Sequence, residues 1–261
     1  MAIFTTDNIH SKMNKLHRLK FLRKSLLVFL LVTTTGLAIA QTYRPYKSGV
    51  ITYHGYSFPI VPGTETWKSI SYNQRVASLQ LPADTLQNIS TARLLETCLY
   101  YPFNIDIFAL DDQMYSFNRV KEQFNGYAEL YQRTDFVQEL MNLYSSRSVS
   151  FRNQMEVGYE KGYYASDYCI LEFLFTDAAS LASDTQAAQI ATMLYEKKEQ
   201  KVQCSYGNIN KVMIALAIGR CLQRSDAFSD YQGTTLPAFL QSGKLIAASD
   251  LDYIYSKARN L

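Results

Sequence analysis

Apolar side chains recur at helical spacing along most of the chain. Four of them mark the clearest helical face: Met114, Phe117, Val120 and Phe124. Their intervals of three, three and four residues place all of them on one side of a helix. The run 212–218 is apolar on every side, which is typical of a buried helix. The pattern predicts an all-α fold.

Helix-capping and helix-breaking residues divide this pattern into about seven or eight helices. One helix is expected from Thr66 to just before Pro82, because the residue before a proline disfavours helix. Asn125-Gly126 is expected to end the helix that carries Phe124, and the polar segment 145–162 to form a loop. Further helix starts are expected at Ser90 or Thr91, Asp111 or Asp112, Asp135 (with Gln138, as a capping box), Ser166, Ser183 or Asp184, Gly207, and Ser249 or Asp250.

The chain ahead of the helices is expected to be an extended arm, over 41–63. It contains the β-prone runs 50–53 and 56–58 on either side of Gly55, so a short hairpin is one possibility. Two strands alone are marginally stable in water, and the arm must therefore pack on the helices. No linker divides 64–261, which predicts a single helical domain, either a bundle or a short solenoid of helix pairs.

Residues 1–40 have the three parts of an export signal. Six basic residues precede an apolar run over 25–40, and Ala38-Ile39-Ala40 has the small-x-small pattern that signal peptidases cleave. The run is shorter than the roughly 20 residues that a membrane-spanning helix needs. Cleavage before Gln41 is therefore expected, with no stable membrane span afterwards and a periplasmic or extracellular location. Met13 offers an alternative start to Met1 for the same signal.

Removing this segment changes the charge of the protein. The whole chain has 26 basic and 23 acidic residues, and residues 1–40 hold six of the former and one of the latter, which leaves 20 − 22 = −2. A chain this close to neutral lacks the basic surface of a nucleic-acid-binding protein, so no nucleic acid partner is expected.

The cysteines offer two alternatives. An exported protein with an even number of cysteines can form disulfides, and the four candidates are Cys98, Cys169, Cys204 and Cys221. Each of them, however, lies in an apolar helical stretch, where free cysteine is commonly a buried thiol. The sequence alone is compatible with either disulfides or buried free thiols.

A string of short motifs between residues 67 and 144 resembles a known group of proteins. The motifs are Leu81-Pro82, Ile89-Ser90-Thr91, Leu94-Leu95, Cys98-Leu99, Tyr101-Pro102, Asp106-Ile107, Phe124-Asn125-Gly126-Tyr127, Glu129-Leu130 and Arg133. This string resembles uncharacterised exported helical proteins of the Bacteroidota type. The resemblance implies an envelope or extracellular setting and a helical fold, and it transfers no site residue.

The residues offer little catalytic or cofactor chemistry. His54 is the only histidine after residue 40, and a nucleophilic site would have to pair it with Cys98, which lies mid-helix on an apolar face. The acids Asp106, Asp111 and Asp112 lack the glycine and terminal glutamate of a calcium loop, and Asp111 and Asp112 are better explained as helix caps. No metal site and no cofactor are predicted.

Paired carboxylates give a weaker enzymatic alternative. Glu156 and Glu160 lie one helical turn apart, but sequence alone cannot place two acids across a cleft, as glycoside cleavage requires. Glu129 and Arg133 at i, i+4 are expected to form an ion pair instead. A hydrolase acting on cell-wall or dietary polymers remains the second hypothesis.

Tyrosine is the one compositional excess, with 20 residues. Tyr159, Tyr163 and Tyr164 gather in the polar-aromatic segment, and tyrosine is favoured where one end of a side chain is apolar and the other wet. The sequence therefore predicts a non-catalytic exported protein that binds another protein or an envelope component, with these three tyrosines at the contact.

Overall fold

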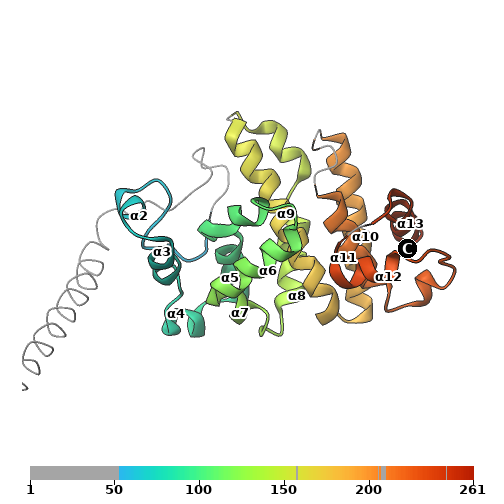
Figure 1. Cartoon of the computed structure of the whole chain (residues 1–261), viewed down its shortest axis with the longest axis horizontal. Helices are drawn as coiled ribbons and strands as arrows, with labels where there is room; N and C mark the ends of the chain where they lie inside the picture. The colour runs from blue at the N-terminus through green and yellow to red at the C-terminus, as the bar shows by residue number, and fades with distance from the viewer. Residues whose placement is uncertain (1–52, 157, 205, 207–209, 245) are drawn as a thin grey trace, which may run out of the picture.

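The computed structural model describes residues 53–156, 158–204, 206, 210–244 and 246–261. Within these residues every regular element is a helix, so the all-α prediction is confirmed. The predicted signal over 1–40 lies outside the described residues. Along the longest axis of the molecule, the helices follow one another from α2 at one end to α12 and α13 at the other (Figure 1).

The helices of the first half of the chain are α2 (Glu65–Ser69), α3 (Tyr72–Ser78), α4 (Ala83–Asn88), α5 (Thr91–Leu99), the 3-10 helix η1 (Pro102–Phe108), α6 (Gln113–Gln123), α7 (Asn125–Leu130) and α8 (Phe136–Ser146). Those of the second half are the 3-10 helix η2 (Val149–Gln154), α9 (Gly158–Leu181), α10 (Asp184–Gln203), α11 (Lys211–Leu222), the 3-10 helix η3 (Asp226–Phe228), α12 (Leu236–Ser242) and α13 (Ala248–Arg259).

Three of the predicted helix starts are confirmed by their caps. The Ser90 side chain begins α5, and the Asp112 carboxylate begins α6 by accepting from the backbone N–H of Tyr115 at 2.9 Å. Ser183 begins α10 and forms a reciprocal capping box with Gln186. Each cap uses a partner three residues away, so the local sequence determines it.

The predicted helix from Thr66 to Pro82 is wrong, because the chain divides it into α2 and α3. Ile70 is extended, and Ser71 forms a capping box with Gln74 that begins a new helix. Asn125-Gly126 also does more than end α6. The Asn125 side chain exchanges two hydrogen bonds with the backbone of Leu81, at 2.9 and 2.8 Å, and α7 begins there.

The capping box predicted at Asp135 does not form. Its carboxylate instead accepts a hydrogen bond from the Thr91 hydroxyl at 2.6 Å, which ties the start of α8 to the start of α5. The last predicted helix is present, and α13 begins at Ala248, one residue before the predicted Ser249, but the predicted cap is wrong because no side chain caps it.

The loop predicted over 145–162 is largely helical. It contains the end of α8, all of η2 and the first turn of α9, whose predicted start at Ser166 lies about two turns inside the helix. The segment 223–247, for which no element was predicted, contains η3 and α12.

The described part of the arm packs on α5. The backbone N–H of His54 donates to Glu96 at 2.7 Å, and that of Tyr56 donates to the Thr97 hydroxyl at 2.8 Å. The Phe58 ring packs against Tyr101 and Phe124. From residue 53 onward the arm forms no strand, and side chains of α5 accept hydrogen bonds from its backbone N–H groups.

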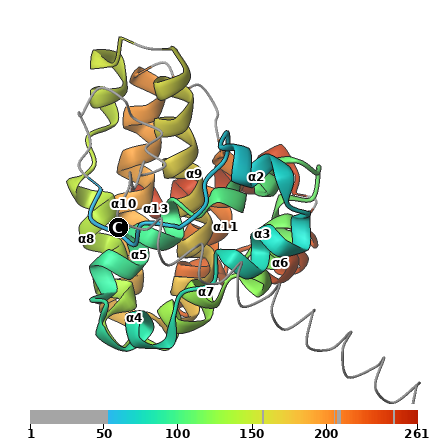
Figure 2. The same cartoon turned by 90° about the vertical axis from the view of Figure 1, so that its left-hand side faces the viewer.

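Helix α9 is the centre of the structure. It contacts α5, α8, α10 and α11, and the remaining contacts mostly join helices that are near one another in the chain, which gives a stack of helices rather than a closed bundle. Figure 2 views this arrangement from the side. Among the described helices, none has both the length and the apolar character needed to cross a bilayer.

Three acids of α9 form ion pairs with three other parts of the chain. Asp167 pairs with Arg147, which follows α8, at 3.0 Å; Glu172 pairs with Lys201 of α10; and Asp177 pairs with Lys121 of α6. The first two pairs are buried. Because an unpaired buried charge is costly, these pairs fix the position of α9 against its neighbours.

Candidate functional site

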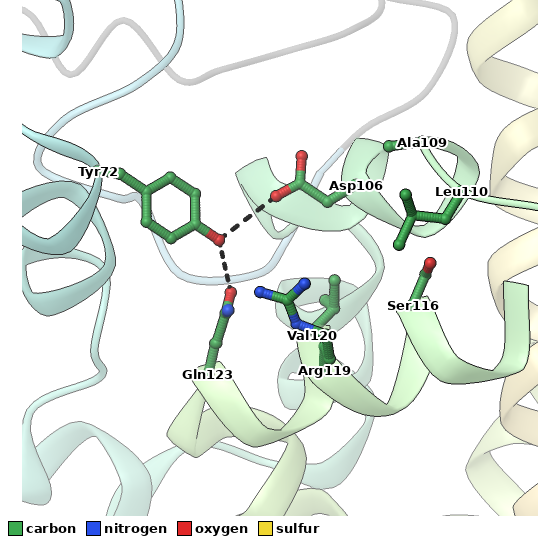
Figure 3. A pocket seen from close by; sticks show the side chains of 8 residues that line it. All are labelled: Tyr72, Asp106, Ala109, Leu110, Ser116, Arg119, Val120 and Gln123. Atoms are coloured by element: carbon green, nitrogen blue, oxygen red, sulfur yellow. Dashed lines mark hydrogen bonds between the residues drawn. The ribbon is translucent and has the colours of Figure 1, made fainter. Parts of the chain in front are cut away.

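Two surface hollows lie beside η1. The first, here called the polar hollow, has a volume of about 260 Å³ and is lined by Tyr72, Asp106, Ala109, Leu110, Ser116, Arg119, Val120 and Gln123 (Figure 3). The second, here called the apolar slot, is smaller, about 50 Å³, and is lined by Leu99, Tyr100, Tyr101, Pro102, Asn104, Ile105, Phe108, Tyr163, Ser166, Asp167 and Ile170.

Three elements supply the polar side chains of the polar hollow. Tyr72 is the first residue of α3, Asp106 belongs to η1, and Arg119 and Gln123 lie one turn apart on α6. The Asp112 cap fixes where α6 begins, and so which of its residues face η1. Figure 3 shows the side chains of Tyr72, Asp106, Arg119 and Gln123 turned toward the same space.

The Tyr72 hydroxyl connects two of these groups. It donates to Oε1 of Gln123 at 2.8 Å and lies 3.4 Å from Oδ2 of Asp106. Burial raises the pKa of the Asp106 carboxyl, while the Tyr72 hydroxyl and the positive charge of Arg119 partly oppose that rise. Asp106 is thus a half-buried carboxylate that its surroundings stabilise only in part.

Arg119 is exposed at the edge of the polar hollow. Its guanidinium lies 5.9 Å from the centre of the Tyr115 ring, and it forms no hydrogen bond or ion pair with any residue that the structure describes. Its five N–H donors are therefore available to water or to a ligand.

The apolar slot has a polar floor that is already hydrogen-bonded. Tyr100 donates to Asp167 at 3.0 Å, and Arg147 donates both to Asp167 at 3.0 Å and to the Tyr100 hydroxyl at 2.9 Å. Burial raises the pKa of the Tyr100 hydroxyl, which keeps it protonated as a donor. Because these groups satisfy one another, the surface that the slot offers to a partner is mainly apolar.

Two of the three predicted contact tyrosines lie at the surface. Tyr159 is 47% exposed and Tyr163 36% exposed, and their rings pack edge to face with centres 6.1 Å apart. Tyr163 also lines the apolar slot. Tyr164 is only 2% exposed, and its hydroxyl donates to the backbone of Ser148, so the prediction of Tyr164 as a contact residue is wrong. Because successive residues of a helix point in different directions, Tyr164 faces the interior while Tyr163 faces the surface.

Sequence reasoning missed most of the exposed apolar side chains near η1. Of the nine large apolar side chains that are exposed among the described residues, six lie on η1 or on segments near it: Tyr72, Ile105, Leu110, Tyr115, Tyr159 and Tyr163. We call these six the η1 surface. No pattern in the sequence groups them, because they come from α3, η1 and the residues after it, α6 and α9.

The catalytic candidates are not assembled. Cys98 is fully buried, and burial raises the pKa of its thiol, so it is not an activated nucleophile. Glu160 is fully buried while Glu156 is exposed, and each of the two hollows is lined by a single carboxylate. Glu129 and Arg133 form the predicted ion pair at 2.8 Å.

The remaining ligand-type residues have structural partners. Asp112 caps α6 and pairs with Lys244 at 2.7 Å, and the hydrogen bond from Lys244 lowers the pKa of its carboxyl. Within the described residues no group of three or more metal-ligating side chains comes together. All four cysteines are free thiols, and Cys204 is the only one of the four that is not buried.

Comparison of the chain with known protein families, curated proteins and solved structures found no match.

Proposed function

We propose that this chain is an exported, non-catalytic helical protein that binds another protein through the η1 surface. The observation that carries the proposal is the clustering of exposed apolar side chains around one short helix. Single exposed apolar residues are ordinary, whereas a group of them marks an interaction surface. Tyrosine and arginine, which surround η1, are also the residues enriched at protein interfaces.

Four of the six side chains line the two hollows beside η1. Tyr163 and Ile105 line the apolar slot on one side of η1, and Leu110 and Tyr72 line the polar hollow on the other. Arg119 joins this surface to Tyr115 through its contact with that ring.

The apolar slot favours a partner with an exposed apolar side chain. Its polar floor is satisfied by Arg147, and its small volume suits the tip of one aliphatic side chain rather than a free ligand. Ile105, 64% exposed beside the slot, and Tyr163 would flank the inserted side chain. The expected occupant is a protein segment that inserts one apolar residue there.

Site-specific photo-crosslinking tests this proposal. A photoreactive residue at position 105 or 163 should give a discrete adduct in an envelope extract of the producing cells. Unlabelled protein should compete for this adduct, and unlabelled Ile105→Lys should compete at least about tenfold more weakly, because a buried charge opposes binding. Position 181, where Leu181 is 53% exposed away from η1, is the matched control.

Three outcomes would contradict the proposal. They are no adduct at 105 or 163, the same adduct at 181, and adducts formed only with a second copy of the chain. Export is tested separately by the N-terminus of the protein recovered from the cell envelope, which should be Gln41.

The hydrolase alternative lacks a supporting arrangement of acids. Glycoside cleavage needs two carboxyls roughly 5–10 Å apart across a cleft. The polar hollow contributes Asp106 alone, and the apolar slot Asp167, which Arg147 already holds.

A further inference from the structure

The polar hollow holds hydrogen-bonding groups that the protein itself does not use. The Asp106 carboxylate has one long contact, 3.4 Å from the Tyr72 hydroxyl, and its second oxygen bonds to none of the described residues. The side-chain NH₂ of Gln123 and the guanidinium of Arg119 donate to none of them either. Asp106 and Gln123 are partly buried, and polar groups in such positions require water or a ligand as hydrogen-bond partners.

The charges in the polar hollow favour a neutral ligand. One carboxylate, Asp106, faces one guanidinium, Arg119, and the positive charge of Arg119 acts against the burial that raises the Asp106 pKa. A purely anionic or cationic ligand would be attracted by one of these groups and repelled by the other. A neutral molecule whose atoms both donate and accept would satisfy both, and hydroxyl groups have that property.

The size and the apolar walls indicate a ligand of one ring. The volume of about 260 Å³ lies below the 300–1,000 Å³ typical of drug-sized ligand sites. The Tyr72 ring, 41% exposed, and the Leu110 side chain, 49% exposed, supply apolar surface beside the polar groups. A compact ring with an apolar face and a hydroxylated edge matches this combination.

We propose that the polar hollow binds a single neutral sugar ring, either free or at the end of a glycan. Asp106 accepts hydrogen bonds from adjacent hydroxyls, Arg119 and Gln123 donate to hydroxyl oxygens, and the Tyr72 ring packs against the apolar face. This site shares Tyr72 and Leu110 with the η1 surface but no residue with the apolar slot, and it does not depend on the protein contact there.

NMR titration of the processed, ¹⁵N-labelled protein tests the site. The probes are glucose, galactose, mannose and N-acetylglucosamine, each as the free sugar and as its methyl glycoside, which imitates a ring linked to a chain. At least one probe should cause saturable shifts of amides in 105–123. Preference for the glycoside indicates a terminal glycan unit, and binding of the free sugar alone a monosaccharide.

Variants of the hollow make the test specific. Asp106→Asn and Arg119→Met should each weaken binding by about tenfold or more, because each removes a charged hydrogen-bonding partner. Asp111→Asn changes an exposed neighbouring acid outside the hollow and should leave binding unchanged. Thermal unfolding of each variant confirms that it is folded.

The proposal is overturned if none of the sugars gives a saturable shift, or if Asp106→Asn and Arg119→Met bind as well as the unchanged protein. It is also overturned if glycine or acetate binds at 105–123 in place of the sugars, since the hollow would then select charge. Retention of the photo-adduct at position 105 by Asp106→Asn separates this site from the protein contact.

Discussion

At the scale of single residues, Asp106 is a carboxyl whose ionisation opposes folding. Burial raises its pKa, so as the pH increases from about 3.9 the unfolded chain loses its proton before the folded one. Stability attributable to this group therefore falls over that pH range. Asp106→Asn should raise the free energy of unfolding at pH 7 by a few tenths of a kcal/mol, since solvent screens a partly exposed group.

Urea unfolding at two pH values checks this prediction. The difference between Asp106→Asn and the unchanged protein should disappear at pH 3, where both states of the chain are largely protonated. Asp111→Asn, exposed and outside the hollow, should show no comparable gain. If Asp106→Asn lowered the free energy of unfolding by more than about 1 kcal/mol at pH 7, Asp106 would stabilise the fold instead of being available to a ligand.

A second residue-scale prediction concerns the buried pair of Lys201 and Glu172. Glu172 is fully buried and accepts from Lys201, from the Tyr144 hydroxyl at 2.8 Å and from the Asn210 amide at 2.9 Å. Lys201→Met leaves this carboxylate without its counter-charge, which should cost about 3–5 kcal/mol in urea unfolding.

The double variant Lys201→Met/Glu172→Gln separates charge from packing. It removes both charges together, so it should be more stable than Lys201→Met alone. If the double variant were less stable than Lys201→Met, the hydrogen bonds that Glu172 accepts would contribute more to stability than its pairing with Lys201.

At the scale of elements, a glycine that ends one helix and a glycine inside another respond differently to the same substitution. Gly243 ends α12 with φ +73°, and an added Cβ would lie 2.8 Å from Met114 and 2.9 Å from Leu216. Gly243→Ala should therefore cost about 2 kcal/mol or more, from left-handed backbone strain and overpacking.

Gly162 is the matched comparison within α9. An added Cβ there meets no atom within 4 Å, so Gly162→Ala should stabilise the protein by about 0.5–1 kcal/mol through helix propensity. Thermal unfolding of the two variants should shift in opposite directions. Equal destabilisation by both would show that α9 is not helical at residue 162.

Elements that depend on local chemistry could be predicted from the sequence. Ser90, Asp112 and Ser183 cap their helices through residues three positions away. Asp135 has the same local pattern, but its carboxylate bonds to Thr91, 44 residues earlier in the chain. The start of α9 was missed for a related reason, since burial of Tyr164 and Glu160 within the tertiary structure keeps a glycine-containing segment helical.

At the scale of the whole molecule, the candidate site follows from how distant segments meet. Tyr72 contacts Asp106 and Gln123 across separations of 34 and 51 residues, and no periodicity in the sequence reports such pairings. The tyrosine-rich segment was the one signal that composition could give. It identified Tyr159 and Tyr163, but the position of Tyr163 across the apolar slot from Ile105 depends on the packing of α9 beside η1.

The four cysteine thiols should differ in their reactivity. Burial raises the pKa values of the Cys169 and Cys221 thiols to about 12, and that of Cys98 well above its usual range, whereas Cys204 is partly exposed at the end of α10. Because the thiolate is the reactive form, native protein isolated without reductant should react rapidly with a thiol reagent at Cys204 alone, and at four thiols after denaturation. Cys204→Ser should abolish the rapid reaction. Fewer than four thiols in the unreduced, denatured protein would instead show that oxidation joins cysteines that the folded structure keeps apart.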